Sequence, residues 1–251
     1  MLVMGILNVT PDSFADGGKY LPTKVATAYG LEMAKDGADI IDIGGESTRP
    51  GAERVSESEE QARVIPVIRA LAQSSVVISV DTMRASTAKL AVEAGASIVN
   101  DVSGGAADPE MFSAVAAMGC KYALMHWRGH SKDMNTKAIY GDVVADVIAE
   151  LTIALEKALV AGIKGENIIL DPGIGFAKDA EHNWEILRRI DQFVALGYPI
   201  LIGHSRKRFL GGEKPDEREA ATVKVTQSLV GSGIWGVRVH GVKANVEAIN
   251  L

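Results

Sequence analysis

A regular alternation of short apolar runs and longer amphipathic stretches extends along the chain and constrains its fold more than any other feature. The apolar runs, which we expect to be strands, are residues 3–9, 40–44, 77–80, 98–100, 122–125, 168–170, 199–202 and 236–239. Most are continuous runs of Val, Ile and Leu, which is typical of parallel strands covered on both faces. The predicted helices between them are residues 23–35, 57–71, 84–93, 109–118, 142–161, 183–196 and 217–232, with a short last helix from Lys243.

Glycines follow many of the predicted helices at the position where a left-handed residue commonly ends a helix. These glycines are Gly37, Gly95, Gly119, Gly162 and Gly197. Eight successive βα units close most simply into a (β/α)8 TIM barrel of the α/β class, and an open doubly wound sheet is the alternative. With 251 residues, the chain is expected to form a single barrel domain over residues 1–251.

The composition excludes several classes of protein. Hydrophobic residues make up 47% and charged residues 23% of the chain, which is enough apolar material for a large core. No apolar run reaches the roughly 18 residues of a membrane span, and the first residues lack the features of a signal peptide, so we expect a cytoplasmic protein. A single cysteine, Cys120, excludes an internal disulfide framework. The net charge of -6 gives no long-range attraction for nucleic acid or an anionic membrane, so local donors must meet any phosphate.

Polar residues follow every predicted strand, at the end of the barrel where active sites of this fold lie. They are Asn8, Glu46, Ser47, Thr48, Arg49, Asp81, Thr82, Asn100, Asp101, His126, Asp171, Ser205, Arg206, Lys207, Arg238 and His240. Some of them could simply cap helices, and for Thr82 and Asp101 that alternative is equally good. Capping does not explain the cations, which are unfavourable beside the positive end of a helix dipole. The cations therefore indicate an anionic substrate.

Two predicted loops, residues 8–22 and 45–56, exceed the roughly 2 to 6 residues usual for a βα turn and could close over a ligand. Asp81, Asn100 and Asp171 suit a flat, amide-rich heterocycle, because a carboxylate accepts two parallel N–H bonds from a guanidine-like ring edge. By themselves these three residues could equally be structural.

Seven segments resemble the motifs of the dihydropteroate synthase family and occur in that family's order between residues 8 and 240. They are Asn8-Val9-Thr10-Pro11-Asp12-Ser13-Phe14, Gly44-Gly45-Glu46-Ser47-Thr48-Arg49-Pro50-Gly51, Ser79-Val80-Asp81-Thr82, Asn100-Asp101-Val102-Ser103-Gly104, Asp171-Pro172-Gly173-Ile174-Gly175-Phe176, Ser205-Arg206-Lys207 and Arg238-Val239-His240.

The resemblance implies condensation of 6-hydroxymethyl-7,8-dihydropterin pyrophosphate with p-aminobenzoate to 7,8-dihydropteroate, a step of folate biosynthesis that requires Mg2+. The implied catalytic residues are Asn8, Asp81, Asp171, Lys207, Arg238 and His240, with Asn8 also at the metal. The implied substrate-binding residues are Phe14, Thr48, Arg49, Pro50, Asp81, Asn100, Met125, Asp171, Phe176, Gly203, Ser205, Lys207, Arg238 and His240. Phe14 and Pro50 would flank the p-aminobenzoate ring, where sulfonamides are expected to compete. The resemblance also favours a homodimer formed by barrel helices.

The chain departs from the common pattern of that family in a few places. Trp127 and Arg128 follow Met125-His126, Arg208 follows the Ser205-Arg206-Lys207 segment, and Gly241 stands where Asp often follows the last motif. These departures keep open a catalytically silent pterin-binding paralogue. A pterin-dependent methyltransferase is a weaker alternative, because those enzymes lack the segments containing Arg49 and Lys207. His204 cannot pair directly with Ser205, since neighbours on a strand face opposite sides, and we expect it to be packed or capping.

Overall fold

Eight parallel strands form one sheet that curves into a barrel. The computed structural model describes residues 1–10, 21–46, 54–130 and 134–250. The strands are β1 (Leu2–Asn8), β2 (Ile40–Gly44), β3 (Val77–Asp81), β4 (Ile98–Asp101), β5 (Lys121–Met125), β6 (Ile168–Asp171), β7 (Leu201–Ile202) and β8 (Gly236–Val239). Their order in the sheet is β6-β5-β4-β3-β2-β1-β8-β7, and a single parallel bridge between Leu170 and Ile200 joins the two ends. The predicted (β/α)8 TIM barrel is thereby confirmed.

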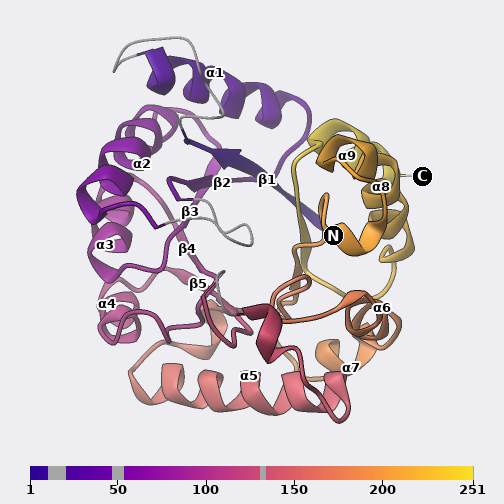
Figure 1. Ribbon diagram of the computed structural model, residues 1–251. Helices are drawn as coiled ribbons and strands as arrows, with labels where there is room; N and C mark the ends of the chain where they lie inside the picture. Colours follow the sequence, from indigo (N-terminus) through magenta and orange to yellow (C-terminus); the bar gives the residue numbers. More distant parts are fainter. Residues whose placement is uncertain (11–20, 47–53, 131–133, 251) are drawn as a thin grey trace.

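Helices form an outer ring around the strands, as seen along the barrel in Figure 1. The α-helices are α1 (Leu21–Lys35), α2 (Glu57–Leu71), α3 (Ala85–Ala94), α4 (Met111–Met118), α5 (Val143–Val160), α6 (Ala180–Arg188), α7 (Ile190–Val194), α8 (Glu219–Ser228) and α9 (Val242–Ile249). Short 3-10 helices are η2 (Met134–Lys137), η3 (Gly165–Asn167), η4 (Arg208–Leu210) and η5 (Pro215–Arg218). None of the helices in the described part of the chain is long and apolar enough to cross a membrane.

Side chains alternate along each strand between the helical layer and the barrel interior. In β2, Ile41 and Ile43 belong to the large apolar core against the helices, whereas Ile40 belongs to a small interior cluster. That interior cluster comprises Met4, Ile40, Ile98, Ala123, Ile169 and Leu201, one from each of six strands. Residues two positions further along these strands share the inward direction. The alternation therefore directs Asp42, Asn100, Met125, Asp171 and Gly203 into the barrel mouth.

The predicted helix over residues 183–196 is wrong in one respect, because two helices occupy this region. The first, α6, begins at Ala180, since Asp179 accepts a hydrogen bond from the backbone N–H of His182 and the two residues form a capping box. The chain then leaves the helical conformation at Arg189, where φ is -112° and ψ is 32°, and α7 follows. The glycines predicted to end helices do adopt positive φ, for example 120° at Gly95 and 65° at Gly119.

Candidate active site

The inward-facing carboxylates and amide of three strands meet at the carboxyl end of the barrel. Asp81 ends β3, where it is paired in register with Gly44 on one side and Asn100 on the other. Asp171 ends β6 and pairs with Met125. Asp81, Asn100 and Asp171 are all buried, at 7%, 3% and 5% exposure. The structure thus brings together the three residues expected to bind a heterocycle.

Arg238 of β8 lies among these groups and links several strands through its guanidinium. Its Nε donates to Asp42 Oδ2 at 2.6 Å, and its Nη2 donates to Asp81 Oδ2 at 2.7 Å. Asn100 Nδ2 donates to the same Asp42 oxygen at 3.0 Å. Asp42 was not among the predicted site residues, although it is fully buried and holds both Arg238 and Asn100. A lone carboxylate in the apolar run of β2, on the inward face, was the signal that could have identified it.

Burial controls the ionisation of the two carboxylates that face the mouth. It raises the pKa of Asp81 to about 7, with the Arg238 charge opposing this shift and the Asp42 charge adding to it. Burial also raises the pKa of Asp171, while the hydrogen bond from the Gly173 N–H at 2.7 Å favours its ionised form. Perturbed carboxylates of this kind in a concave site are typical of ligand binding.

Lys207 approaches the same mouth from the loop after β7. Its Nζ donates to the carbonyl oxygen of Ile174 and lies 4.2 Å from the centre of the Phe176 ring. Burial lowers the pKa of Lys207 to about 7, and the Asp171 carboxylate opposes that shift. Lys207, Asp171 and Phe176 therefore form one side of the candidate site.

Ser205 and His240 form a second contact between the loop after β7 and the end of β8. Ser205 Oγ lies 2.9 Å from His240 Nδ1 and accepts a hydrogen bond from the His240 N–H at 3.1 Å. His204 points away from this contact, with its Nε2 at 3.1 Å from the carbonyl oxygen of Thr222 in α8. The expectation that His204 is a packed residue is confirmed, because its side chain is fully buried.

The remaining predicted site residues divide into two groups. Asn8, Met125 and Gly203 lie at or just beyond the ends of β1, β5 and β7, on the side of the barrel mouth. A Cβ atom added at Gly203 would lie 3.8 Å from Asp171 Oδ2, which places this glycine directly beside the carboxylate. Predictions for Phe14, Thr48, Arg49 and Pro50 fall outside the described residues.

Other polar residues predicted from the strand ends have structural roles. Asp101 accepts hydrogen bonds from the Ser103 N–H at 2.8 Å and the Tyr122 hydroxyl at 2.7 Å, on the outer side of the sheet. Glu46 accepts from Arg84 at 2.8 Å, and Arg84 also donates to Glu60 of α2 at 2.6 Å. These contacts fix the first turns of the βα loops, so Asp101 and Glu46 support the mouth from outside.

Two of the departures from the family pattern have local explanations. Arg128 donates to Glu150 of α5 through Nε at 3.0 Å, so its charge is directed away from the mouth. A Cβ atom at Gly241 would lie 2.0 Å from Glu219 Oε1, so a larger residue at this position requires the Glu219 side chain to move. The Glu219 carboxylate of α8 thus already occupies the space beside position 241.

Asn8 is the described residue that we expected at a metal ion. In the described segments, no group of three or more His, Cys, Asp or Glu side chains could hold a metal ion. Asn8, half-buried at the end of β1 beside Gly44, offers an amide oxygen, which is a hard ligand. Mg2+ usually keeps several waters and binds through one or two protein oxygens together with substrate phosphates. The donor set fits an ion that is shared with a diphosphate.

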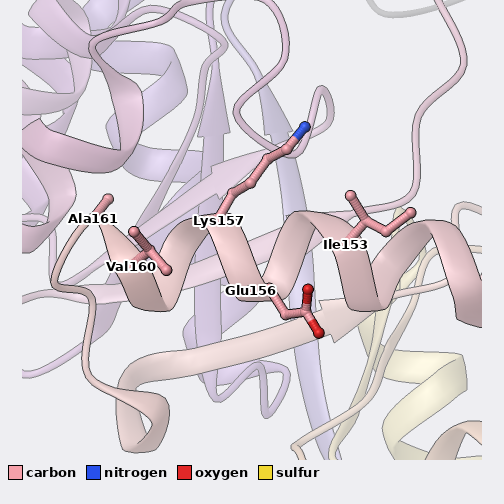
Figure 2. A pocket seen from close by; sticks show the side chains of 5 residues that line it. All are labelled: Ile153, Glu156, Lys157, Val160 and Ala161. Atoms are coloured by element: carbon pink, nitrogen blue, oxygen red, sulfur yellow. The ribbon is translucent and has the colours of Figure 1, made fainter.

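A separate hollow lies on the outer surface of α5 (Figure 2). It is lined by Ile153, Glu156, Lys157 and Val160 from the carboxyl-terminal half of the helix, and by Ala161, which follows it. Because α5 runs back toward the start of β6, this half lies away from the strand ends that bear the polar residues. The hollow does not gather the polar groups expected of an active site, and the barrel mouth remains the candidate.

Comparisons with known proteins agree with this assignment. The family described as pterin binding enzyme matches residues 4–240. A dihydropteroate synthase of Mycobacterium leprae is 47% identical over an alignment of 259 positions, which covers 99% of this chain and 91% of the relative. The structure of Xanthomonas albilineans dihydropteroate synthase with 4-aminobenzoic acid superposes with a TM-score of 0.93 at 42% identity, covering 99% of this chain and 90% of that one. The Yersinia pestis dihydropteroate synthase in a sulfonamide drug complex gives a TM-score of 0.93 at 40% identity, covering 99% and 92%.

Proposed function

Because the chain belongs to the pterin binding enzyme family, we infer from its barrel mouth that it is a dihydropteroate synthase. It joins 6-hydroxymethyl-7,8-dihydropterin pyrophosphate to p-aminobenzoate and releases pyrophosphate. The observation that carries this assignment is the convergence of Asp81, Asn100, Asp171 and Arg238 at one barrel mouth. The chain is also similar over 99% of its length to a dihydropteroate synthase.

The proposed reaction breaks the bond between the pterin methylene carbon and the diphosphate oxygen, and forms a bond from that carbon to the amine nitrogen of p-aminobenzoate. Asp81 and Asp171 would accept N–H groups of the ring edge and favour the positive charge that develops as the diphosphate departs. The bond electrons leave with the diphosphate, and the amine loses a proton after attack. An arylamine attacking such a cation needs no strong base, so positioning and charge account for most of the catalysis.

Charge on the departing diphosphate needs compensation, which we assign to Arg238 and His240 together with Arg49. Asn8 would hold Mg2+ with oxygens of the diphosphate, and the ion would supply further neutralisation of the leaving group. Lys207 would contact the pterin from its place above Phe176.

The second substrate is assigned to the outer part of the mouth. Phe14 and Pro50 would flank the p-aminobenzoate ring, with Ser205 near its carboxylate. Sulfonamides have the same outline as p-aminobenzoate and should compete with it there, as the sulfonamide complex of the Yersinia pestis relative supports. Thr48 would assist binding from the same loop as Arg49.

A coupled assay for pyrophosphate release tests the proposal. Release should require both substrates and Mg2+, and mass spectrometry should identify 7,8-dihydropteroate as the product. A chain that binds the pterin but releases no pyrophosphate would be the catalytically silent paralogue. Methyl transfer from a tetrahydrofolate to a corrinoid would instead indicate the methyltransferase.

We further propose that the enzyme works in the cytoplasm as a homodimer formed through barrel helices, as the family resemblance favours. Light scattering on a purified sample would measure the mass, and a monomer at assay concentration would contradict the dimer.

A further inference from the structure

Lys178, which follows the loop after β6, has a fully satisfied ammonium group in the interior. The residue is 7% exposed. Its Nζ lies 2.9 Å from His126 Nδ1 and donates to the carbonyl oxygens of Gly173 and Phe176, both at 3.1 Å. An ammonium has three donors and no acceptor, so these three acceptors use its full capacity. Burial lowers the pKa of Lys178 to about 7, and the Asp171 charge opposes this shift.

The partner of His126 on the other side of the ring fixes the direction of these hydrogen bonds. His126 Nε2 lies 2.9 Å from Glu150 Oε2 of α5. The hydrogen bond with His126 lowers the pKa of Glu150 to about 2, so the carboxylate is an acceptor and Nε2 must carry the hydrogen. Burial and the Lys178 charge lower the pKa of His126 to about 4, so its ring is neutral and Nδ1 is left as an acceptor. Only a protonated Lys178 donates to all three acceptors.

Glu150 also connects, through Arg128 and Tyr140, to a second point of the loop after β6. Arg128 donates to Glu150 and stacks on Tyr140, with its guanidinium carbon 3.8 Å from the ring centre. The Tyr140 hydroxyl donates to the carbonyl oxygen of Ala177 at 2.9 Å. Ala177 has a φ of 48°, a left-handed conformation that is unfavourable for a residue with a Cβ. Such a residue persists only where its surroundings hold it in place.

The loop held in this way carries the contacts of two residues in the proposed pterin site. The Gly173 N–H donates to Asp171 Oδ1 at 2.7 Å, and Lys207 donates to the Ile174 carbonyl oxygen. Phe176 lies under the Lys207 ammonium. Any shift of residues 173–176 would therefore move the acceptor and the cation that face the pterin.

We propose that Lys178, directed by the His126–Glu150 pair, is a positioning residue that fixes the loop after β6 for pterin binding. This role rests on the proposed function, because it acts through Asp171 and Lys207. Arg128 and Tyr140 belong to the same cluster, which gives the variant loop after β5 a task distinct from substrate contact.

The first test replaces Lys178 by methionine, which keeps an unbranched side chain only one atom shorter and removes all three donors. Calorimetry with 6-hydroxymethyl-7,8-dihydropterin pyrophosphate should show at least a tenfold weaker Kd, while the KM for p-aminobenzoate changes less than twofold. The matched control is Lys157→Met on the exposed surface of α5 (Figure 2), which should bind the pterin like the unmodified protein. A folded Lys178→Met variant with a pterin Kd within twofold of the unmodified protein would overturn the proposal, as would an equal effect of Lys157→Met.

The second test does not depend on how well Lys178→Met folds. Glu150 is a partly exposed residue of α5, and Glu150→Leu removes the acceptor that fixes the His126 ring. Nitrogen NMR shifts should show the Nε2–H tautomer of His126 in the unmodified protein and a mixed tautomer in Glu150→Leu, with a pterin Kd three- to tenfold weaker. An Nδ1–H tautomer in the unmodified protein would overturn the assignment.

Failure of the positioning role and failure of the proposed function give different results. Both tests compare the pterin Kd between variants, and this comparison requires no turnover; only the KM for p-aminobenzoate in the first test does. A protein that binds the pterin, loses this binding in Lys178→Met and makes no dihydropteroate would retain the positioning role and lose the synthase function.

Discussion

Substitution of Asp42 by alanine should weaken pterin binding about tenfold, although Asp42 lies below the residues that we place against the substrate. One oxygen of Asp42, Oδ2, accepts from Arg238 at 2.6 Å and from Asn100 at 3.0 Å. The other, Oδ1, is buried and has no hydrogen-bond partner in the described part of the chain. The substitution therefore releases a cation and an amide of the site together.

The magnitude follows from opposing contributions. Removing one partner of a buried ion pair usually costs about 3–5 kcal/mol, because a charge is left uncompensated. Arg238 keeps its hydrogen bond to Asp81 at 2.7 Å, and loss of the unpartnered oxygen removes a desolvation cost of about 1–3 kcal/mol. We therefore expect the free energy of unfolding to fall by about 2 kcal/mol, within the range for a single buried polar substitution. The looser placement of Arg238 and Asn100 should cost about 1.4 kcal/mol in pterin binding, which is tenfold in Kd.

The assay should use a pterin without the diphosphate, because removal of a negative charge from the mouth would itself strengthen phosphate binding. Calorimetry gives the pterin Kd and urea unfolding gives the stability. Asp39→Ala is the matched control, since Asp39 lies just before the opposite end of β2 and its carboxylate accepts from the Val3 N–H at 2.8 Å. Equal pterin affinity in Asp42→Ala and Asp39→Ala would refute the idea that Asp42 organises the site.

Four further predictions test other parts of the reasoning. Lys207→Ala should lower kcat/KM at least about 100-fold in the pyrophosphate-release assay. Urea titration should show a change of less than about 1 kcal/mol in the free energy of unfolding. A large loss of stability would instead mark Lys207 as structural. Gly175→Ala should raise the KM for the pterin, because the new Cβ would lie 2.4 Å from Lys207 Cδ and the φ of Gly175 is 76°. An unchanged KM would contradict the close approach of Gly175 and Lys207. Burial lowers the pKa of His204 to about 4, so on acidification this histidine binds a proton at a higher pH in the unfolded chain than in the folded protein. Stability should fall by up to about 3 kcal/mol between pH 6.5 and 4, and urea titrations of His204→Gln should lack this part of the loss. Sulfonamide inhibition should be relieved by added p-aminobenzoate in the pyrophosphate assay, and inhibition that is insensitive to p-aminobenzoate would place the drug elsewhere.

Much of the fold could be predicted because it depends on local patterns. The strand predictions for residues 40–44 and 236–239 agree with β2 and β8, since runs of Val and Ile between glycines leave few alternatives. The helix over residues 183–196 was predicted as continuous because its amphipathic pattern continues through Arg189. The break there depends on the conformation of one residue, for which the pattern carries no signal.

The site divides in the same way between local and non-local information. Asp81 and Asp171 were found because the ends of barrel strands identify them directly. Asp42 was missed because it lies two residues before the end of its strand, although its inward direction could have been counted from the alternation of β2. The contact between Lys178 and His126 joins positions 52 residues apart, and it depends on how the loop after β6 packs beside the end of β5. Sequence reasoning has no means of finding such a pair.

Arg238 connects the two electrostatic requirements of the proposed reaction, which are to bind a polar ring and to receive a departing diphosphate. A guanidinium has five N–H donors in a rigid plane. Nε and Nη2 are directed to Asp42 and Asp81, so this plane is fixed before any substrate arrives. The other N–H donors of Arg238 are then held in place without a further loss of side-chain entropy. A charge that is fixed in advance stabilises a leaving group most effectively. The chain has a net charge of -6, so any attraction for a diphosphate must be local. We assign part of it to the Arg238 donors that the bonds to Asp42 and Asp81 leave unused.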